Sequence, residues 1–287
     1  MGGMLQTPDL AADGHALPLM QHPAMARALR HLGRPAQIEH INETCQALVI
    51  RTSLGPLGSF GFASRGPIWL GPTSRPQQVS DLRQAKLHLL NADGLAHDVL
   101  RNAGFVRIVS ATHIAELPVA PNARMQLARC RGKWRNAYQQ GLQHDLKVTL
   151  ETYQDAAHQW LLQADRAQQR SKRFRNLPHP VMRAYHAANP GMVRVMTARQ
   201  GKSIVAGMMF LVHKPVATYY IGWTTPEGRA ARAHHVMLMQ AGRKLGVERL
   251  DLGTVNTEDA PGLARFKIGS GAVIRSLGGT WAKLPFC

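Results

Sequence analysis

The residues with the clearest capacity for chemistry lie in the C-terminal stretch from Gly246 to Trp281. Asp251 stands within a short apolar run that ends at Gly253, a pattern typical of a buried strand with one polar residue. After a polar loop, a short basic turn carries Lys267, and a last predicted strand closes the stretch. A lysine held at such a turn could deliver one fixed cation to a substrate carbonyl, where negative charge develops during nucleophilic attack.

This stretch resembles the C-terminal end of the FemAB-like branch of the GNAT superfamily. In that branch an Asp-x-Gly pattern is followed by Gly-x-x-x-Phe-Lys-x-x-x-Gly, and the matching residues here are Asp251, Gly253, Gly262, Phe266, Lys267 and Gly271. The resemblance implies that Lys267 stabilises the oxyanion and that Phe266 packs to hold the turn. We expect substrate contacts from Phe266, Arg265, Tyr220 and Trp223.

The base that takes the proton of an attacking amine is harder to identify. Asp251 is the first candidate as a catalytic residue beside the lysine, but a carboxylate on a strand can equally be hydrogen-bonded structure. Glu258 and Asp259, in the loop that follows, are alternatives. Tyr219 and Tyr220 are consecutive on a predicted strand beside the expected site, so only one of them can face it.

A phosphate of the donor is expected where the loop after the third antiparallel strand enters the next helix. In GNAT folds this place holds the pyrophosphate of coenzyme A, because backbone N–H groups and the positive helix end favour an anion. Arg229 and Arg232 lie there, although they could also be ordinary exposed arginines. The usual Gln/Arg-x-x-Gly-x-Gly/Ala signature is incomplete, since no glycine follows Arg229 at the needed spacing. We therefore expect an acyl-CoA or an aminoacyl-tRNA as co-substrate, with no permanently bound cofactor and no metal.

A second match lies in the basic segment from Arg124 to Leu142. The segment is predicted to be one helix, and its ending, Arg-Asn-Ala-x-x-x-Gly, resembles the inter-domain helix of FemAB-like proteins. Its charged face could contact phosphate or nucleic acid. Alternatively, that face is simply solvated while Cys130 and Trp134 face the core.

The composition indicates an anionic partner. The chain has 35 lysines and arginines against 17 acidic residues, a net charge of +18 and a pI near 10.9. Such a surplus favours nucleic acid, anionic lipid or phosphate-bearing substrates, although it could be only a basic surface. The run from Lys172 to Arg175 is predicted to be exposed and, if the donor is a tRNA, to contact it. The competing function is a non-catalytic basic GNAT relic that binds nucleic acid or an anionic surface.

Several classes of protein lose support. The three cysteines, Cys45, Cys130 and Cys287, are far apart and form neither a metal-ligand pair nor a disulfide framework. The sequence has no zinc spacing, nucleophile elbow, Walker loop or dinucleotide fingerprint, which disfavours hydrolases, ATPases and dehydrogenases. The pair His234-His235 lacks the aspartate found in condensation enzymes and is expected on a helix surface.

The location expected from the sequence is the cytoplasm. No secretory signal is visible at the N-terminus, and the sequence has no apolar run of the roughly 18 residues that a membrane-spanning helix needs. The resemblance implies an amine acceptor, which could be a cell-envelope precursor.

The strand and helix patterns indicate an α/β chain made of two GNAT-like acyltransferase halves, with mixed, mostly antiparallel sheets flanked by helices. The second half gives the clearer order: a strand, two helices, three antiparallel strands, a helix and two more strands. The first half repeats this order loosely, with a strand at Ala47 to Thr52, a turn at Gly55-Pro56 and a helix at Ser80 to Leu89 capped by Ser80. We expect a degenerate GNAT-like domain over residues 1–120 and an acyltransferase domain over residues 121–287.

Overall fold

The computed structural model describes residues 16–53, 55 and 58–283, so Pro56 of the expected turn lies outside the described residues. The chain forms two compact units: unit 1 is Met1–Ile114 with Arg275–Cys287, and unit 2 is Ala115–Ile274. This division differs from the expected boundary between residues 120 and 121. The chain returns to unit 1 at Arg275 because its last strand pairs within the sheet of unit 1.

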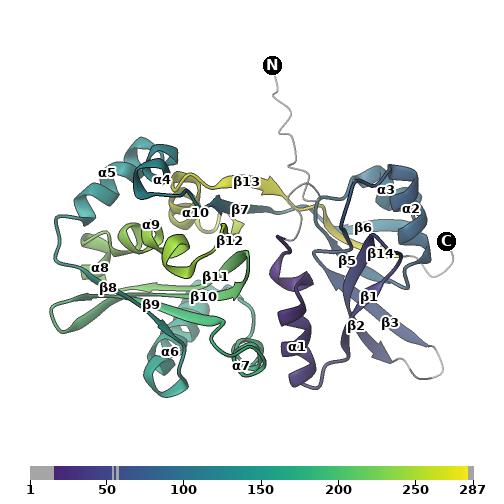
Figure 1. Ribbon diagram of the computed structural model, residues 1–287, viewed down its shortest axis with the longest axis horizontal. Coiled ribbons are helices and arrows are strands. Elements are labelled where there is room, and N and C mark those ends of the chain that lie inside the picture. The colour runs from purple at the N-terminus through teal and green to yellow at the C-terminus, as the bar shows by residue number, and fades with distance from the viewer. Residues whose placement is uncertain (1–15, 54, 56–57, 284–287) are drawn as a thin grey trace. The chain divides into compact units, whose positions relative to one another are not determined.

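Unit 2 is built on a seven-stranded sheet in the order β13-β7-β12-β11-β10-β9-β8 (Figure 1). Its strands are β7 (His113–Pro118), β8 (Lys147–Thr152), β9 (Val193–Gln200), β10 (Ser203–His213), β11 (Val216–Thr224), β12 (Arg249–Val255) and β13 (Val273–Ser276). Strands β8, β9, β10 and β11 pair antiparallel in that order, and β11 pairs with β12 in parallel. Strand β10 is apolar and buried along most of its length, because elements pack on both of its faces.

Helices cover both faces of this sheet. They are α4 (Ala123–Arg129), α5 (Gly132–Gly141), α6 (Asp155–Lys172), α7 (His179–Ala188), α8 (Pro226–Ala230), α9 (Ala233–Leu245) and α10 (Pro261–Gly269). Figure 1 shows α9 on one face of the sheet and α6 and α7 on the other. The larger apolar core lies on the α9 face, where Met208 and Phe210 of β10 pack with Met237 of α9.

The segment predicted as one helix from Arg124 to Leu142 forms two helices, α4 and α5, so that prediction is wrong. The backbone between them is extended at Cys130 and Arg131, with ψ angles of 147° and 152°. The Arg131 N–H donates to the Gly269 carbonyl over 2.9 Å, and the Cys130 thiol contacts the Ser270 carbonyl at 3.2 Å. These contacts with the end of α10 fix the joint, so tertiary structure outweighs local helix propensity.

Unit 1 contains a smaller version of the same arrangement. Its sheet has the order β1-β2-β3-β5-β14-β6, with β4 paired to β2 at the side. The strands are β1 (Ala36–His40), β2 (Cys45–Ser53), β3 (Ser59–Ser64), β4 (Ile68–Trp69), β5 (Leu89–Ala92), β6 (Phe105–Val109) and β14 (Gly279–Lys283). The helices are η1 (Leu19–Gln21), α1 (Pro23–His31), α2 (Arg75–Gln84) and α3 (His97–Asn102).

The helix predicted from Ser80 to Leu89 has the wrong bounds, since α2 runs from Arg75 to Gln84. Helix α2 starts five residues earlier, because the Ser74 side chain accepts a hydrogen bond from the Gln77 N–H and so caps its first turn. Leu89 belongs to β5, where it pairs in parallel with Phe62 of β3. The apolar residues that suggested one helix therefore belong partly to the end of α2 and partly to the buried strand β5.

The two units follow one chain path. In unit 1 the antiparallel strands β1, β2 and β3 are followed by α2, β5, α3 and β6; in unit 2 β9, β10 and β11 are followed by α8 and α9, β12, α10 and β13. The third and fourth strands of each series pair in parallel. A left-handed glycine follows the last helix of both series, Gly104 at φ 86° and Gly271 at φ 88°. The chain therefore consists of two GNAT-like halves.

Each sheet is completed by a strand that follows the other half in the sequence. Strand β7 comes directly after β6 of unit 1, yet it lies between β12 and β13 in the sheet of unit 2. Strand β14 comes directly after β13, yet it lies between β5 and β6 in the sheet of unit 1. Equivalent places in the two sheets are thus filled by exchanged strands. Among the described residues, none of the helices combines the length and apolar character needed to cross a membrane.

Candidate active site

The parallel strand pair of unit 2 opens towards one end. Strands β11 and β12 pair only over Val216–Thr218 and Arg249–Asp251, after which β11 continues to Thr224 and β12 to Val255. In unit 1 the corresponding pair stays together, since Ser64, the last residue of β3, still pairs with Asn91 of β5. A substrate group could therefore enter between these two strands of unit 2.

Asp251 stands where the paired part of β12 ends. Its carboxylate accepts a hydrogen bond of 2.8 Å from the Gly253 N–H, and its exposed fraction is 3%. Gly253 has a left-handed φ of 73°, a conformation that costs a residue with a side chain energy. The Asp-x-Gly spacing thus has a local reason. The Asp251 side chain stabilises a sharp bend at Gly253, whose backbone conformation is easy only for glycine.

Lys267 lies beside this bend. It comes from α10, its exposed fraction is 5%, and its Nζ donates to the Thr254 carbonyl over 2.7 Å. Nζ is 3.9 Å from the point where a Cβ on Gly253 would stand. Burial lowers the pKa of Lys267 to about 8, while the nearby Asp251 acts in the opposite direction. The lysine is therefore mostly protonated at neutral pH, and it forms a fixed cation in a place with little water.

Phe266 fixes α10 against two other helices. Its ring lies 6.2 Å from the ring of Trp134 in α5 and 5.1 Å from that of His235 in α9. Trp134 and His235 are themselves 5.0 Å apart. The packing role expected for Phe266 agrees with this geometry, and its contact with substrate stays a prediction.

The pair His234-His235 does not lie on an open helix surface, contrary to our expectation. Both side chains are partly buried, and burial lowers the pKa of each to about 4, so both are neutral at pH 7. His234 Nε2 donates to the Trp223 carbonyl over 2.9 Å. His235 is enclosed by the aromatic rings of α5 and α10.

Tyr219 and Tyr220 are consecutive on β11 and face opposite sides of the sheet, as side chains along a strand do. Phe210 pairs with Tyr219 and Met209 with Ile221, which leaves Tyr220 as the extra residue. The ring of Tyr219 packs with Phe210 in the core on the α9 face. The Tyr220 hydroxyl donates to the Leu177 carbonyl over 2.7 Å, and burial raises the pKa of Tyr220 above its usual value. Tyr220 thus anchors the loop after α6, and the structure does not bring it to Lys267.

Trp223 and Arg265, two further predicted substrate contacts, lie on different elements. Trp223 is partly exposed on β11 and packs edge-to-face with Trp160 of α6 at 5.3 Å. Trp160 rests on Gly207, where an added Cβ would stand 2.7 Å from its ring. Arg265 is exposed on α10. Trp160 is not recognisable as a site residue in the sequence, because at helical spacing it has the pattern of an ordinary core residue.

Arg229 lies within the short helix α8, which takes the place of the expected loop, and Arg232 directly precedes α9. Gly228 serves packing there, since a Cβ would stand 2.2 Å from the Val205 carbonyl. Arg229 Nη1 donates to the Thr224 carbonyl over 3.1 Å, and Arg232 Nε donates to Gln140 over 3.3 Å. Arg232 is the residue before α9 and has a left-handed φ of 55° with no side-chain cap. In unit 1, by contrast, the side chain of a serine caps α2.

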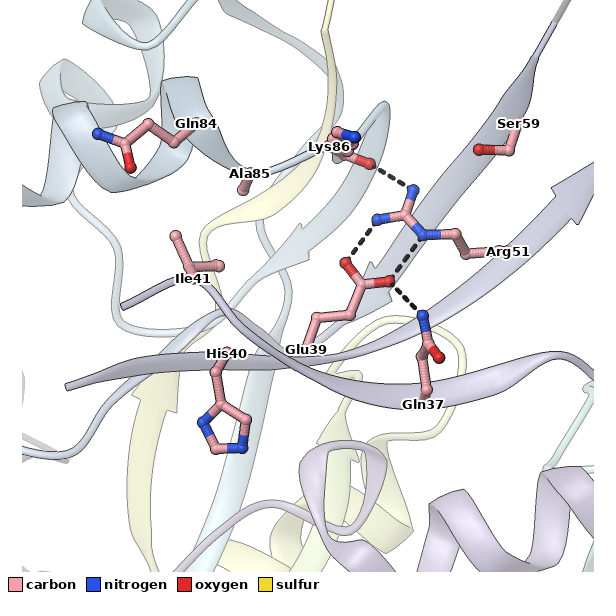
Figure 2. A pocket seen from close by; sticks show the side chains of 9 residues that line it. All are labelled: Gln37, Glu39, His40, Ile41, Arg51, Ser59, Gln84, Ala85 and Lys86. Carbon is pink, nitrogen blue, oxygen red and sulfur yellow. Dashed lines mark hydrogen bonds and ion pairs between the residues drawn. The ribbon is translucent and has the colours of Figure 1, made fainter. Parts of the chain in front are cut away.

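Unit 1 contains an open polar pocket, shown in Figure 2, that has none of the predicted site residues. Arg51 crosses its floor and binds Glu39 through Nε and Nη2, while Nη1 donates to the Lys86 carbonyl over 2.9 Å. The charges of Arg51 and Glu39 thus neutralise each other. The pocket has no arrangement suited to acyl transfer.

Neither described cysteine is a nucleophile. Burial raises the pKa of Cys45 to about 12 and that of Cys130 to about 11, so both thiols stay protonated. Among the described residues, no group of three or more His, Cys, Asp or Glu side chains is placed to hold a metal ion.

Comparisons with known proteins agree with this fold. The model of the acetyltransferase (GNAT) domain family matches residues 124–267, which is half of the chain. The crystal structure of FemX superimposes with a TM-score of 0.73 at 13% identity, covering 96% of this chain and 94% of that one. No curated protein sequence matches.

Two further structures share the fold. The C-terminal domain of a lysylphosphatidylglycerol synthetase from Agrobacterium fabrum has a TM-score of 0.56 at 15% identity, covering 96% of this chain and 91% of that one. L-PGS from Bacillus licheniformis has a TM-score of 0.53 at 12% identity, with 91% and 88% covered. The chain belongs to the acetyltransferase (GNAT) domain family, has the fold of its FemAB-like branch, and is an N-acyltransferase.

Proposed function

We propose that unit 2 transfers an acyl or aminoacyl group from an activated donor directly to a primary amine. The observation that carries this proposal is the buried Lys267 cation beside Asp251, at the point where β11 and β12 part. The donor carbonyl would enter between the two strands. Its oxygen would then lie near a cation that needs no rearrangement during the reaction.

In the proposed step Asp251 takes a proton from the acceptor ammonium, and the amine nitrogen attacks the carbonyl carbon. Lys267 stabilises the oxyanion. The new carbon–nitrogen bond stays, the bond from the carbonyl carbon to the sulfur or oxygen of the donor breaks, and the remaining excess proton passes from nitrogen to that leaving atom. No covalent intermediate with the chain is needed, which agrees with the protonated state of both described thiols.

The donor is an acyl-CoA or an aminoacyl-tRNA, and we place its phosphate at the start of α9. Arg232 supports this placement. A left-handed conformation costs a residue with a Cβ about 1–2 kcal/mol, and a glycine would join α8 to α9 at lower cost. A charged side chain kept at this position is understandable if it binds an anion together with Arg229 and the positive helix end.

Cell-envelope precursors with a primary amine belong among the acceptors to be tested, and both donor classes place the reaction in the cytoplasm. The test incubates the purified chain with a panel of primary amines and either acetyl-CoA or a mixture of aminoacyl-tRNAs, and detects amide products by mass spectrometry. Small molecules that co-purify with the chain, identified in the same way, would narrow the panel. Amide formation supports the proposal; failure to bind and use either donor class contradicts it.

The second candidate function is binding of nucleic acid or an anionic surface without catalysis. It is favoured by the exposed run Lys172–Arg175, where Phe174 has an exposed fraction of 40% between arginines. Arg173 there has a left-handed φ of 51°. Exposed cations with an aromatic ring between them suit single-stranded nucleic acid. Salt-dependent RNA binding with no transfer to any amine would favour this candidate over the first.

A further inference from the structure

The part of β11 that lies beyond its split from β12 has one edge paired with β10 and one open edge. The Thr225 N–H donates to the Val205 carbonyl over 3.0 Å. Along two antiparallel strands, residues that are hydrogen-bonded to the partner strand alternate with residues that are not. The register therefore makes Trp223 and Ile221 the next residues bonded to β10. The residues that alternate with them direct their carbonyls away from β10, towards the side from which β12 has parted.

Three carbonyls face this open edge. Those of Thr224 and Gly222 alternate with the bonded residues, and that of Tyr220 lies in the planar peptide group whose N–H points to β10. Each of the three accepts a hydrogen bond from a side chain of another element. The donors are Arg229 Nη1 of α8 to Thr224 over 3.1 Å, Gln168 Nε2 of α6 to Gly222 over 3.1 Å, and Asn176 Nδ2 of the loop after α6 to Tyr220 over 2.5 Å. Two amides and one guanidinium group therefore cover the open edge.

Two of these side chains also hold the basic run Lys172–Arg175. While Gln168 Nε2 donates to β11, Gln168 Oε1 accepts from Lys172 Nζ at 3.5 Å. On the other side of the run, Asn176 is bonded to β11, and the next carbonyl, that of Leu177, accepts a hydrogen bond of 2.7 Å from the Tyr220 hydroxyl. The run is thus attached to the open edge of β11 at both of its ends.

The cations that are held in this way remain open to a ligand. Arg173 and Arg175 are exposed, and neither side chain forms an ion pair or a hydrogen bond with another described residue. Arg229 is attached to the same edge of β11, at Thr224. The positive charges of the run and of Arg229 therefore lie along one edge, at the opening between β11 and β12. Such an arrangement suits a ligand with several phosphate groups.

We infer that Gln168 and Asn176 are positioning residues for the donor. They hold the run Lys172–Arg175 at the same edge as Arg229, so that both contact phosphates of one donor. This inference rests on the proposed function, which needs a phosphate-bearing donor at the opening between β11 and β12. A loose loop of cations would lose conformational freedom when it binds phosphates, and the two amides reduce that loss by fixing the loop beforehand. Neither amide touches the reacting atoms.

The first test measures binding of two phosphate-bearing probes, a single-stranded RNA oligonucleotide and coenzyme A. The double variant Gln168→Met with Asn176→Leu removes both amides and keeps side chains of similar size. Gln163→Met, at an exposed position of the same helix, is the control. RNA binding should weaken about tenfold in the double variant, and coenzyme A binding by no more than about twofold, because its few phosphates are held at the start of α9.

Three results of this test overturn the inference. The first is an RNA affinity of the double variant equal to that of the control, and the second is a wild type that binds no RNA. The third is an equal loss for both probes, which would mean that the amides support the whole opening and not the run. If the double variant does not fold, Asn176→Leu alone takes its place, with an expected loss of about threefold.

A second test separates positioning from a merely structural role by removing the cations. In Arg173→Gln with Arg175→Gln the run has lost two charges, and the salt dependence of RNA binding should be flatter than in the wild type. Adding Gln168→Met and Asn176→Leu to this variant should then weaken RNA binding by no more than about a further twofold. A further tenfold loss would mean that the amides act independently of the cations, and it would overturn the positioning role.

Hydrogen–deuterium exchange tests the attachment of the run without any ligand. In Gln168→Met with Asn176→Leu the backbone amides of residues 172–177 should exchange about tenfold faster than in the wild type, while those of α9 should not change. Unchanged exchange over residues 172–177 overturns the inference. If no amine accepts an acyl group, the proposed function fails, and the binding and exchange measurements still decide on Gln168 and Asn176.

Discussion

The two units carry the same series of strands and helices, and they differ where the parallel strand pair ends. Lys267 and Leu100 each lie four residues before the left-handed glycine that follows their helix. Leu100 is fully buried and apolar, whereas Lys267 is a buried cation. Asp251 has Asn91 as its equivalent in the strand pairing. Unit 1 therefore has the same series of strands and helices but lacks the charged residues that correspond to Asp251 and Lys267. This fits the degenerate N-terminal half expected from the sequence.

The charge distribution follows the same division. Unit 2 has 23 lysines and arginines against 10 acidic residues, and unit 1 has 12 against 7. The positive surplus is therefore concentrated in the unit with the candidate site, as expected if the donor carries phosphate. Unit 1 therefore shows that this fold forms without the Asp251–Lys267 pair and with a smaller positive surplus.

The largest effect is expected when unit 2 receives the residues of unit 1. The double variant Asp251→Asn with Lys267→Leu should lose about 10³-fold or more in kcat, since both the base and the oxyanion cation are removed. Leu100→Met, at the equivalent position of unit 1, is the control and should keep its rate. A double variant that keeps a tenth or more of the wild-type kcat would contradict the claim that Asp251 and Lys267 make unit 2 the catalytic unit.

A smaller effect, on stability, is expected from two glycines of the same helix. Gly269→Ala places a Cβ 2.9 Å from the Trp134 ring and should lower the free energy of unfolding by about 1–3 kcal/mol. Gly262→Ala meets nothing within 4 Å and should be neutral or slightly stabilising. Urea unfolding of both variants measures the difference. Equal stabilities would show that α10 is not held by Trp134.

The start of α9 can be compared with the start of α2. Arg229→Ala with Arg232→Ala should raise the KM of the donor about tenfold while lowering kcat less. Arg75→Ala removes an exposed arginine from the first turn of α2 and should leave the donor KM unchanged. Steady-state kinetics at varied donor concentration decides this, and an unchanged KM in the double variant removes the start of α9 from the donor site.

The smallest effect depends on the class of donor. Charge reversal over Lys172–Arg175 should weaken binding of a tRNA donor and flatten its salt dependence, but should do little to an acyl-CoA donor. Binding of both donors is measured over a series of salt concentrations. An equal loss for both would contradict the view that this run serves nucleic acid alone.

The sequence was sufficient for elements whose pattern is local. The strands from Met192 to Trp223 were predicted because long apolar runs are separated by short turns at Gly201 and Pro215. The Asp-x-Gly and Phe-Lys pairs were located because their spacing lies within one short stretch. The structure then supplied a local reason for the first pair, the bend at Gly253.

The missed features depend on partners far away in the sequence. Strand β3 was missed because it contains a glycine and has polar ends. Gly61 is required there, since a Cβ would stand 2.4 Å from the Lys86 carbonyl oxygen and 2.8 Å from the Arg51 side chain. Strand β7 was not predicted either, because its neighbours in the sheet are far away in the sequence. Only the exchange of β7 into the sheet of unit 2 brings it beside β12, more than a hundred residues later.

The central claim is that the Lys267 cation stabilises the oxyanion, and Lys267→Met tests it most directly because it removes the charge and keeps the aliphatic stem. We expect kcat to fall about 10²–10³-fold with little change in KM or melting temperature. Lys283→Met, which removes a lysine from unit 1, is the control.

The wild type and Lys267→Met can also be compared over a range of pH. For the wild type, kcat and stability should then change in opposite directions as the pH rises. Because the folded pKa of Lys267 is about 8, below its ordinary 10.5, wild-type kcat should fall as pH rises above 8. The folded chain releases this proton before the unfolded chain does, so over the same pH range the wild type should gain stability relative to Lys267→Met, by up to about 3 kcal/mol. A Lys267→Met variant that retains more than half of the wild-type rate would contradict the account.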